Sequence, residues 1–393
     1  MFSIWWPAFL LPLAMVLGGV AGGVLPVRKY RGPRGVLPSE EQREADRVFC
    51  RFLWQFGLVY AALAFMVMRT VRLVSLNGQR WFLIGAVAVE IIGAALMVIP
   101  VERTLHALFG EDSIVTEQAP AKINLALLVG EKHPDGYHDV TSVMQSVSLC
   151  DTVTARRTSG GTTLTCSDPT LACDETNLAY RAAALFFEET GVEGGAALTL
   201  EKVIPMQAGL GGGSSDAAAV LRALRRLYAP DMPLEELERM AIRLGSDVPY
   251  CVRGATALVE GRGEHLTQLT ALPACWCVLC KPDIACPTGA MYGEIDRRGA
   301  HLTLDVQEML RALERGDFAA VCALVGNVFE QVIDPESDIF TIRRRLTELG
   351  ADTACMSGSG SAVFGLFTKE ETARAAQELL SQDYPRTFLA KTV

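Results

Sequence analysis

Residues 205–217 read P-M-Q-A-G-L-G-G-G-S-S-D-A, and this stretch guides the interpretation of the whole sequence. Its four glycines allow tight turns and let backbone N–H groups approach an anion with no Cβ atom in the way. Strong helix formers follow, so we expect a helix over residues 215–228. A glycine loop opening onto a helix N-terminus directs orphan N–H groups and the helix dipole at one point, which predicts a phosphate site. The alternative is a glycine-rich strand-to-helix connection without a ligand.

Three common classes of phosphate site are excluded by what the sequence lacks. No G-x-x-x-x-G-K-[ST] occurs, so the site is not a lysine-bearing P-loop. Neither H-R-D nor D-F-G is present, which excludes a protein-kinase-type site. The dinucleotide fingerprint also fails, because Ser214 stands where its third glycine would be. The loop therefore belongs to another class of phosphate-binding protein.

Four further segments accompany the glycine loop in a fixed order. They are A-K-I-N-L at 121–125, H-P-D-G-Y-H at 133–138, G-S-D-V-P-Y at 245–250 and M-S-G-S-G at 356–360. Together with G-L-G-G-G-S-S-D-A at 209–217, they resemble the motifs of the galactokinase, homoserine kinase, mevalonate kinase and phosphomevalonate kinase superfamily. In detail they resemble its 4-diphosphocytidyl-2-C-methyl-D-erythritol kinase family. The resemblance runs from about Ser113 to the C-terminus, with small departures at Gln207 and Ser361.

The resemblance implies a fold and an activity. The fold is α+β with two subdomains, over residues 112–272 and 273–393, and with ATP and substrate in the cleft between them. The activity is ATP-dependent phosphorylation of the 2-hydroxyl of a cytidine diphosphate-linked methylerythritol, in non-mevalonate isoprenoid precursor biosynthesis. Two alternatives remain open: another small-molecule alcohol kinase of the superfamily, or a membrane sensor or scaffold whose domain binds ATP without turnover.

The same resemblance assigns the ATP site and its metal ion. Two loops would hold the nucleotide phosphates, with Mg²⁺ bound by Ser214 or Ser215. The residues assigned to ATP are Pro205, Met206, Gln207, Ala208, Gly209, Leu210, Gly211, Gly212, Gly213, Ser214, Ser215, Gly358 and Gly360.

The resemblance also implies that two residues carry the chemistry. Asp247 would take the proton of the attacking hydroxyl, and Lys122 beside it would keep the carboxylate ionised and stabilise developing negative charge. Taken singly, an aspartate on a turn is more often a helix cap, and a lone lysine more often lies on the surface. Only the joint motif favours the catalytic roles.

Five residues are expected to bind the substrate. Asn124 would orient the reacting hydroxyl, and Tyr137 and His138 match the cytosine-binding pair of the family. Thr288 and Tyr292 come from a later segment, where Tyr292 is the candidate for the opposite face of the base. Ordinary packing is the alternative role for Tyr292.

The first 111 residues differ in composition from the rest. Three apolar stretches, near residues 2–25, 52–68 and 81–101, predict about three transmembrane helices, of which the second is short and the third is interrupted by Glu90. Seven basic residues lie in the first loop, 26–51, so the positive-inside rule predicts a multi-pass protein of the cell membrane with its kinase part in the cytoplasm. The lipid bilayer would then be a partner. A cleaved signal peptide, a gene fusion and a mistaken start site are the alternatives.

The remaining residues carry an acidic excess, which argues against nucleic acid as a partner. Among the 11 cysteines, Cys275, Cys277, Cys280 and Cys286 lie in an apolar run that indicates a buried strand better than a zinc site. We also expect Asp231 to cap a helix that runs to Gly245, and Asp247 to lie on the turn into a strand over 255–260.

Overall fold

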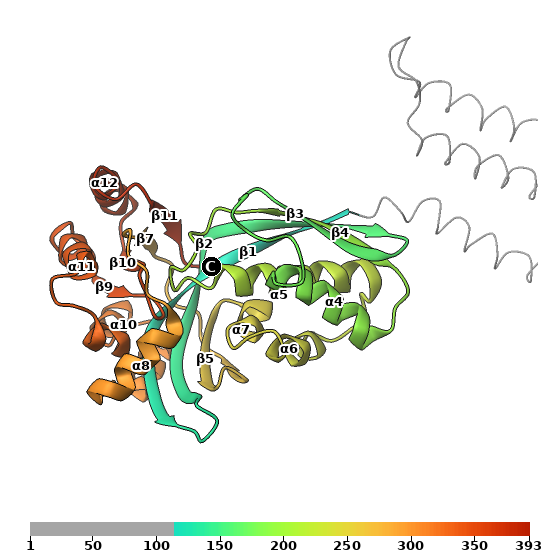
Figure 1. Cartoon of the computed structure of the whole chain (residues 1–393). Helices are drawn as coiled ribbons and strands as arrows, with labels where there is room; N and C mark the ends of the chain where they lie inside the picture. Colours follow the sequence, from blue (N-terminus) through green and yellow to red (C-terminus); the bar gives the residue numbers. More distant parts are fainter. Residues whose placement is uncertain (1–113) are drawn as a thin grey trace, which may run out of the picture. The chain divides into compact units, whose positions relative to one another are not determined.

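The computed structural model describes residues 114–393, which all belong to the compact unit that begins at Ser113 (Figure 1). The three membrane spans predicted near residues 2–25, 52–68 and 81–101 lie outside the described residues. Within residues 114–393, no helix is both long enough and apolar enough to cross a bilayer.

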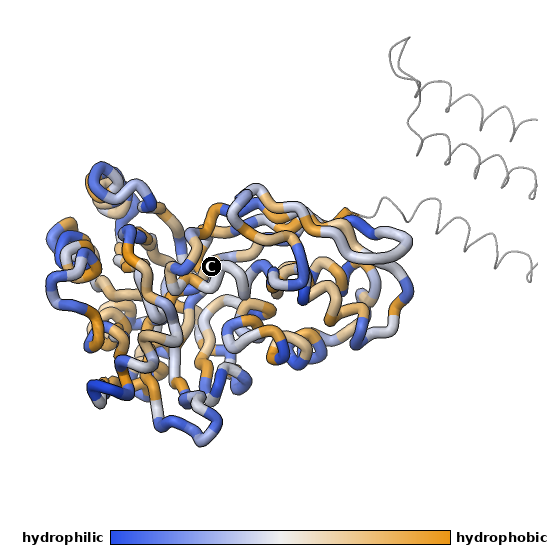
Figure 2. The backbone as a smooth tube through the Cα atoms, in the orientation of Figure 1, coloured by the Kyte–Doolittle hydropathy of each residue, from blue (hydrophilic) through white to orange (hydrophobic). Residues whose placement is uncertain are grey.

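A seven-stranded sheet is built around two long antiparallel strands, β1 (Ile114–Lys132) and β2 (His138–Thr158). The order of its main path is β3-β4-β2-β1-β8, while β5 pairs with β2 and with β6. The bounds are β3 Gly161–Cys166, β4 Gly195–Glu201, β5 Thr256–Gly261, β6 His265–Gln268 and β8 Gly326–Asn327. Figure 2 shows hydrophilic residues at the turn between β1 and β2. Of the predicted substrate site, Tyr137 lies in this turn and His138 begins β2.

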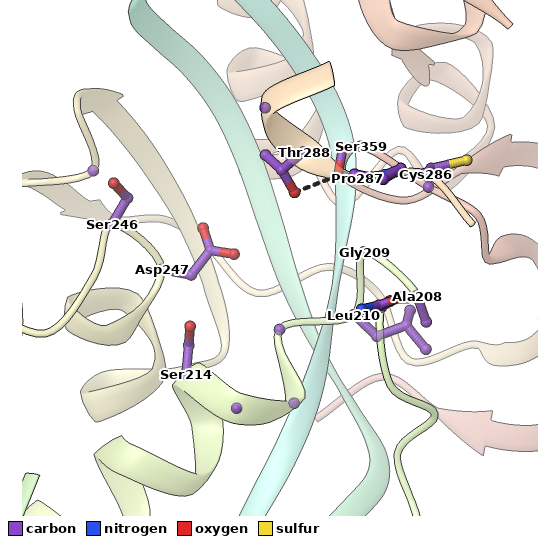
Figure 3. A pocket seen from close by; sticks show the side chains of 18 of the residues that line it. Ala208, Gly209, Leu210, Ser214, Ser246, Asp247, Cys286, Pro287, Thr288 and Ser359 are labelled. Carbon is purple, nitrogen blue, oxygen red and sulfur yellow. Dashed lines mark hydrogen bonds between the residues drawn. The ribbon is translucent and has the colours of Figure 1, made fainter. Parts of the chain in front are cut away.

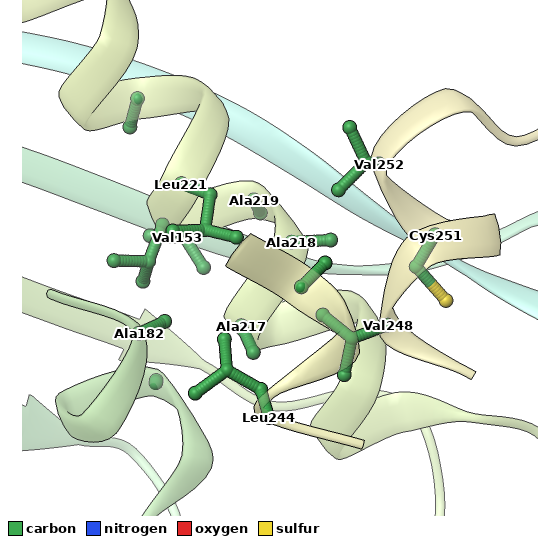
Figure 4. Close-up of a cluster of buried hydrophobic side chains, with 14 of the residues drawn as sticks. Val153, Ala182, Ala217, Ala218, Ala219, Leu221, Leu244, Val248, Cys251 and Val252 are labelled. Atoms are coloured by element: carbon green, nitrogen blue, oxygen red, sulfur yellow. The ribbon is translucent and has the colours of Figure 1, made fainter. Parts of the chain in front are cut away.

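Four helices pack together with this sheet: α4 (Leu178–Thr190), α5 (Gly212–Tyr228), α6 (Leu234–Ile242) and α7 (Val248–Arg253). The central helix is α5, whose residues 217–221 are completely buried. Figure 4 shows Ala217 and Leu221 in the cluster that also contains Val153 and Val248. The helix predicted over 215–228 is confirmed, and it begins three residues earlier, inside the glycine loop.

A four-stranded sheet of order β11-β7-β10-β9 forms the second half of the described chain. Its strands are β7 Trp276–Cys280, β9 Thr353–Met356, β10 Val363–Phe367 and β11 Thr387–Lys391. The helices in this half are α8 Thr288–Arg298, α9 Val306–Glu314, α10 Phe318–Ala323, η2 Val328–Val332, α11 Asp338–Glu348 and α12 Glu370–Ser381. Each of the two sheets is accompanied by helices, and this arrangement confirms the predicted α+β class.

The prediction of a buried strand for the cysteine-rich run is confirmed for two of its four cysteines. Cys277 and Cys280 lie in β7 with no exposed surface, and Cys275 directly precedes it. Burial raises the pKa of the Cys275 and Cys280 thiols to about 11. Among residues 114–393, no group of three or more histidines, cysteines, aspartates or glutamates is placed to hold a metal ion.

Two local predictions are wrong. Asp231 does not cap the next helix, because α6 begins at Leu234 and Pro233 occupies the cap position without a side-chain hydrogen bond. Asp247 does not lead straight into a strand, because the short helix α7 follows it and β5 begins only at Thr256. The missed helix is six residues long, too short for its periodicity to be distinguished from a turn.

Candidate functional site: two glycine loops and an adjoining base pocket

The first loop ends at Gly211, which is the N-cap of α5 and has a φ of 69°. No side chain caps this helix, so no side-chain acceptor occupies the N–H groups of its first turn. Orphan N–H groups and the positive end of the helix dipole together suit an anion. The start of α5 thus has the geometry that the sequence predicted for a phosphate site.

Gly209 is required where the two glycine loops meet. Its φ is 73°, and a Cβ atom built on it would lie 2.0 Å from the carbonyl oxygen of Ser357. The hydroxyl of Ser357 donates to the carbonyl oxygen of Gly209 over 3.0 Å. Gly358 also has a positive φ, of 55°, and a Cβ atom there would lie 2.9 Å from the carbonyl oxygen of Gly209. The loop of residues 356–361 therefore packs directly against the loop of residues 205–211.

Gln207 has a φ of 50°, in the left-handed region that glycine adopts most easily. This residue is one of the two departures from the family motif noted in the sequence. A non-glycine residue here carries a conformational cost of about 1 kcal/mol. The backbone thus explains why glycine suits this position.

Lys122 is buried, with 4% of its surface exposed. Its Nζ lies 3.4 Å from Oδ2 of Asp247 and donates a hydrogen bond of 2.8 Å to Oδ1 of Asn124. Its backbone N–H donates to the carbonyl oxygen of Leu210 over 2.9 Å. The surface alternative for Lys122 is therefore wrong, and strand β1 is joined to the glycine loop at this residue.

Asp247 precedes α7 but makes no capping hydrogen bond with its side chain. The alternative role as a helix cap is therefore wrong, and the carboxylate faces Lys122 instead. The helix behind it is anchored by Tyr250, which is 1% exposed and donates from its hydroxyl to the carbonyl oxygen of Ala255 over 2.7 Å. The backbone of Asp247 is thus fixed by the helix that follows it, while its carboxylate, 34% exposed, stays accessible.

Asn124 joins three parts of the site. Its Oδ1 accepts from Lys122 Nζ and, over 3.0 Å, from the backbone N–H of Gly358. Its Nδ2 donates to Oγ of Ser142 over 2.8 Å. The structure therefore assigns Asn124 contacts that hold Lys122 and the second loop in place. Its predicted contact with the reacting hydroxyl stays a prediction.

The two serines proposed for Mg²⁺ point in different directions. Ser215 is completely buried, and its hydroxyl donates to the carbonyl oxygen of Pro120 over 2.8 Å. Ser214 lines the cavity, and Figure 3 shows it on the same side of the cavity as Asp247. Hydroxyl and carboxylate oxygens are ligands that Mg²⁺ accepts. Of the two serines, only Ser214 has a hydroxyl at the cavity that fits a Mg²⁺ ligand, because the Ser215 hydroxyl is committed to Pro120.

A buried charge cluster beneath the glycine loop was missed by the sequence reasoning. Lys202 Nζ contacts Asp151, and it lies 2.7 Å from Oδ2 of Asp216. Burial is the largest cause that raises the pKa of Asp216, to about 7, and the charge of Asp151 adds to it. Asp216 lies within the quoted motif, so its place beside the loop could have been noticed. Its pairing with a lysine before the loop could not.

The predicted base-binding residues come from the turn after β1 and from α8. Tyr137 is 61% exposed, and the guanidinium of Arg262 lies 5.3 Å from the centre of its ring. Tyr292 stacks on His138 with ring centroids 5.2 Å apart. Thr288 begins α8, and its hydroxyl lies 2.9 Å from that of Ser359 in the second loop (Figure 3). Tyr292 is therefore packed as well as placed at the cavity.

One cavity of about 1120 Å³ contains both groups of residues. Every residue that the sequence predicted for catalysis, ATP or substrate lines it, with the single exception of Ser215. Lys202, Asp216 and Asp296 line it too, although the sequence did not single them out. The cavity is large enough for a nucleotide and a second extended ligand.

Comparison with known proteins agrees with this geometry. The chain matches the families described as "GHMP kinases N terminal domain" over residues 177–255 and "GHMP kinases C terminal" over residues 309–386. It is 44% identical over 259 residues to the 4-diphosphocytidyl-2-C-methyl-D-erythritol kinase of Exiguobacterium sibiricum, covering 65% of this chain and 90% of the relative. The kinase of the same name from Bacillus subtilis is 41% identical over 258 residues, with 65% and 89% covered.

Solved structures show the same relationship. A crystal structure of 4-(cytidine 5'-diphospho)-2C-methyl-D-erythritol kinase is 37% identical, with a TM-score of 0.61 over 71% of this chain and 99% of that one. L. major mevalonate kinase, at 15% identity and a TM-score of 0.59, shares the fold over 72% of this chain and 97% of its own. The chain therefore belongs to the 4-diphosphocytidyl-2-C-methyl-D-erythritol kinase family of the GHMP kinases and is an ATP-dependent small-molecule kinase.

Proposed function

We propose that the chain transfers the terminal phosphoryl group of ATP to the 2-hydroxyl of 4-diphosphocytidyl-2-C-methyl-D-erythritol. The observation that carries this proposal is the Lys122–Asp247 pair, 3.4 Å apart, on the same cavity as the glycine loop and the predicted base-binding residues. The names of the relatives support the choice of substrate.

The chemistry follows from the placement of the two charged groups. A hydroxyl becomes a good nucleophile as it loses its proton, and the Asp247 oxygen farther from Lys122 is the group that takes it. As the new O–P bond forms, the bond between the terminal phosphorus and ADP breaks, and the proton stays on Asp247. Lys122 stabilises the negative charge that develops near it.

The nucleotide would be held mostly by backbone groups. The first turn of α5 presents N–H groups to the phosphates, and the second loop closes against Gly209. Bound Mg²⁺ would supply charge neutralisation on the phosphate oxygens, held on the protein side by Ser214. Phosphoryl transfer depends on such positioning more than on covalent catalysis.

The test is a coupled ADP-release assay with a panel of alcohols. We expect turnover with the cytidine diphosphate substrate and none above background with mevalonate or homoserine. Turnover with another alcohol and none with the cytidine substrate would contradict the proposed substrate. ATP binding without turnover on any alcohol would favour a sensor or scaffold.

We further propose that residues 1–111 anchor the kinase to the cell membrane, with the kinase part in the cytoplasm. The support is the sequence alone: three apolar stretches and the basic loop between the first two. The full chain should then fractionate with membranes and resist extraction by salt, whereas residues 113–393 expressed alone should not. Recovery of the full chain in the soluble fraction would contradict the anchor.

A further inference from the structure

A histidine–carboxylate pair lies at the base-binding end of the cavity. His138 begins β2, and its Nε2 lies 2.7 Å from Oδ1 of Asp296, on α8. A carboxylate can only accept a hydrogen bond, so the hydrogen between them belongs to Nε2. In the neutral ring this leaves Nδ1 without a hydrogen, as an acceptor.

Aromatic packing fixes the plane of the same ring. His138 stacks on Tyr292 with an interplanar angle of 21°, and Phe329 meets Tyr292 edge-on with centroids 5.0 Å apart. Only 4% of the His138 side chain is exposed. Because stacking and the hydrogen bond act together, the ring is held in one orientation.

Asp296 is itself fixed by a second partner. Lys132, the last residue of β1, places its Nζ 2.5 Å from Oδ2 of Asp296. The hydrogen bonds from Lys132 and His138 hold the pKa of the Asp296 carboxyl below its usual range. The carboxylate stays charged at neutral pH and continues to accept from Nε2.

We infer that Asp296 is a positioning residue that makes His138 selective for a base with an exocyclic amino group. By keeping the hydrogen on Nε2, it leaves Nδ1 free to accept from the amino group of a cytosine. A uracil presents a carbonyl oxygen at the same position, and two acceptors would then face each other. This inference rests on the proposed function, because it assumes that the cytidine end of the substrate meets His138.

The experiment uses the full chain and two substrates, the cytidine compound and its uridine analogue. We expect wild type to prefer the cytidine compound. Asp296→Asn should lower the ratio of the two kcat/KM values about tenfold, mainly through KM, because an amide can donate as well as accept and no longer fixes the tautomer. Its KM for ATP should change less than twofold. Glu294→Gln, at a carboxylate of the same helix that pairs with Arg297 and does not line the cavity, is the matched control and should keep the wild-type ratio.

An unchanged ratio in Asp296→Asn, with a lower kcat or melting temperature, would show a merely structural role and overturn the inference. Should Asp296→Asn fail to melt cooperatively, Asp296→Ser supplies the same comparison. Asp296→Glu keeps the carboxylate and should retain more of the ratio than Asp296→Asn, and the reverse order would contradict the inference. A wild type inactive with the cytidine compound overturns the proposed function, which this assay shows before any variant is made.

Discussion

The phosphate end and the base end of the cavity are built in different ways. The phosphate end is formed mainly by backbone N–H groups and glycines. Gly209 and Gly358 allow the two loops to come into contact, and no side chain caps the N-terminus of α5. At the base end, side chains from distant segments pair, and His138 and Asp296 are 158 residues apart. Each loop of the phosphate end needs particular residues at consecutive positions, whereas the base end needs single side chains that only the fold brings together.

The catalytic pair lies between these two ends, and its removal should have the largest effect. Asp247→Asn should lower kcat by about 10²–10⁴-fold, because the attacking hydroxyl loses its base. The KM for ATP should change little, since the phosphate end is left intact. Asp231→Asn, at an exposed aspartate outside the cavity, is the matched control. More than a tenth of wild-type turnover in Asp247→Asn would mean that another group takes the proton.

The backbone character of the phosphate end is tested by adding one methyl group. Gly209→Ala should cost about 1–3 kcal/mol of unfolding free energy and also lower activity, because the new Cβ atom would meet the Ser357 carbonyl. Gly213→Ala is the control for stability, since the nearest atom to its Cβ position is 3.7 Å away. Thermal melts of both variants measure the difference. Equal melting temperatures would mean that the two loops can separate without cost.

The base end should respond in substrate affinity alone. Tyr137→Ala should raise the KM for the cytidine substrate by an amount worth about 1–3 kcal/mol, the range typical of stacking on a base. The KM for ATP should stay within twofold. A similar rise for both substrates would show that Tyr137 supports the fold of the whole cavity and that the two ends are not separate.

Asp216, beneath the phosphate end, should make stability depend on pH. Its folded-state pKa of about 7 is above its usual value of 3.8, so between these values the unfolded chain has released a proton that the folded chain keeps. The unfolding free energy should therefore fall as pH rises from about 4 to about 7, by at most about 1.4 kcal/mol per unit, and then level off. The amide in Asp216→Asn cannot titrate. The difference between the melting temperatures of this variant and wild type should therefore shift in favour of the variant as pH rises from 5 to 7. Parallel pH profiles for the two proteins would show that the carboxyl is already ionised at pH 5.

The smallest effect is expected at Gln207. Gln207→Gly relieves a left-handed backbone but adds freedom to the unfolded chain, so the two changes in free energy oppose each other. We expect a change of less than about 1 kcal/mol in unfolding free energy and no loss of turnover. A clear drop in melting temperature would show that the Gln207 side chain stabilises the loop more than its backbone strains it.

The same contrast explains what the sequence could predict. The glycine loop and α5 could be predicted because each depends on a local motif, whereas the grouping of Lys122 with Asp247 was implied by the family resemblance. The helix that follows Asp247, α7, was missed because six residues are too few to show helical periodicity. The pairing of Lys202 with Asp151 and Asp216, and of His138 with Asp296, left no signal in the spacing. Ser214 and Ser215 could not be separated, because only the direction of α5 decides which hydroxyl faces the cavity.

The central claim is that both ends of the cavity serve one phosphoryl transfer. The most direct measurement is ³¹P NMR of the product formed from ATP and 4-diphosphocytidyl-2-C-methyl-D-erythritol by the full chain. The account predicts one new phosphomonoester on the 2-hydroxyl, formed in step with ADP and absent with Asp247→Asn. Release of ADP without a phosphorylated cytidine product, or a phosphate on a different hydroxyl, would contradict it.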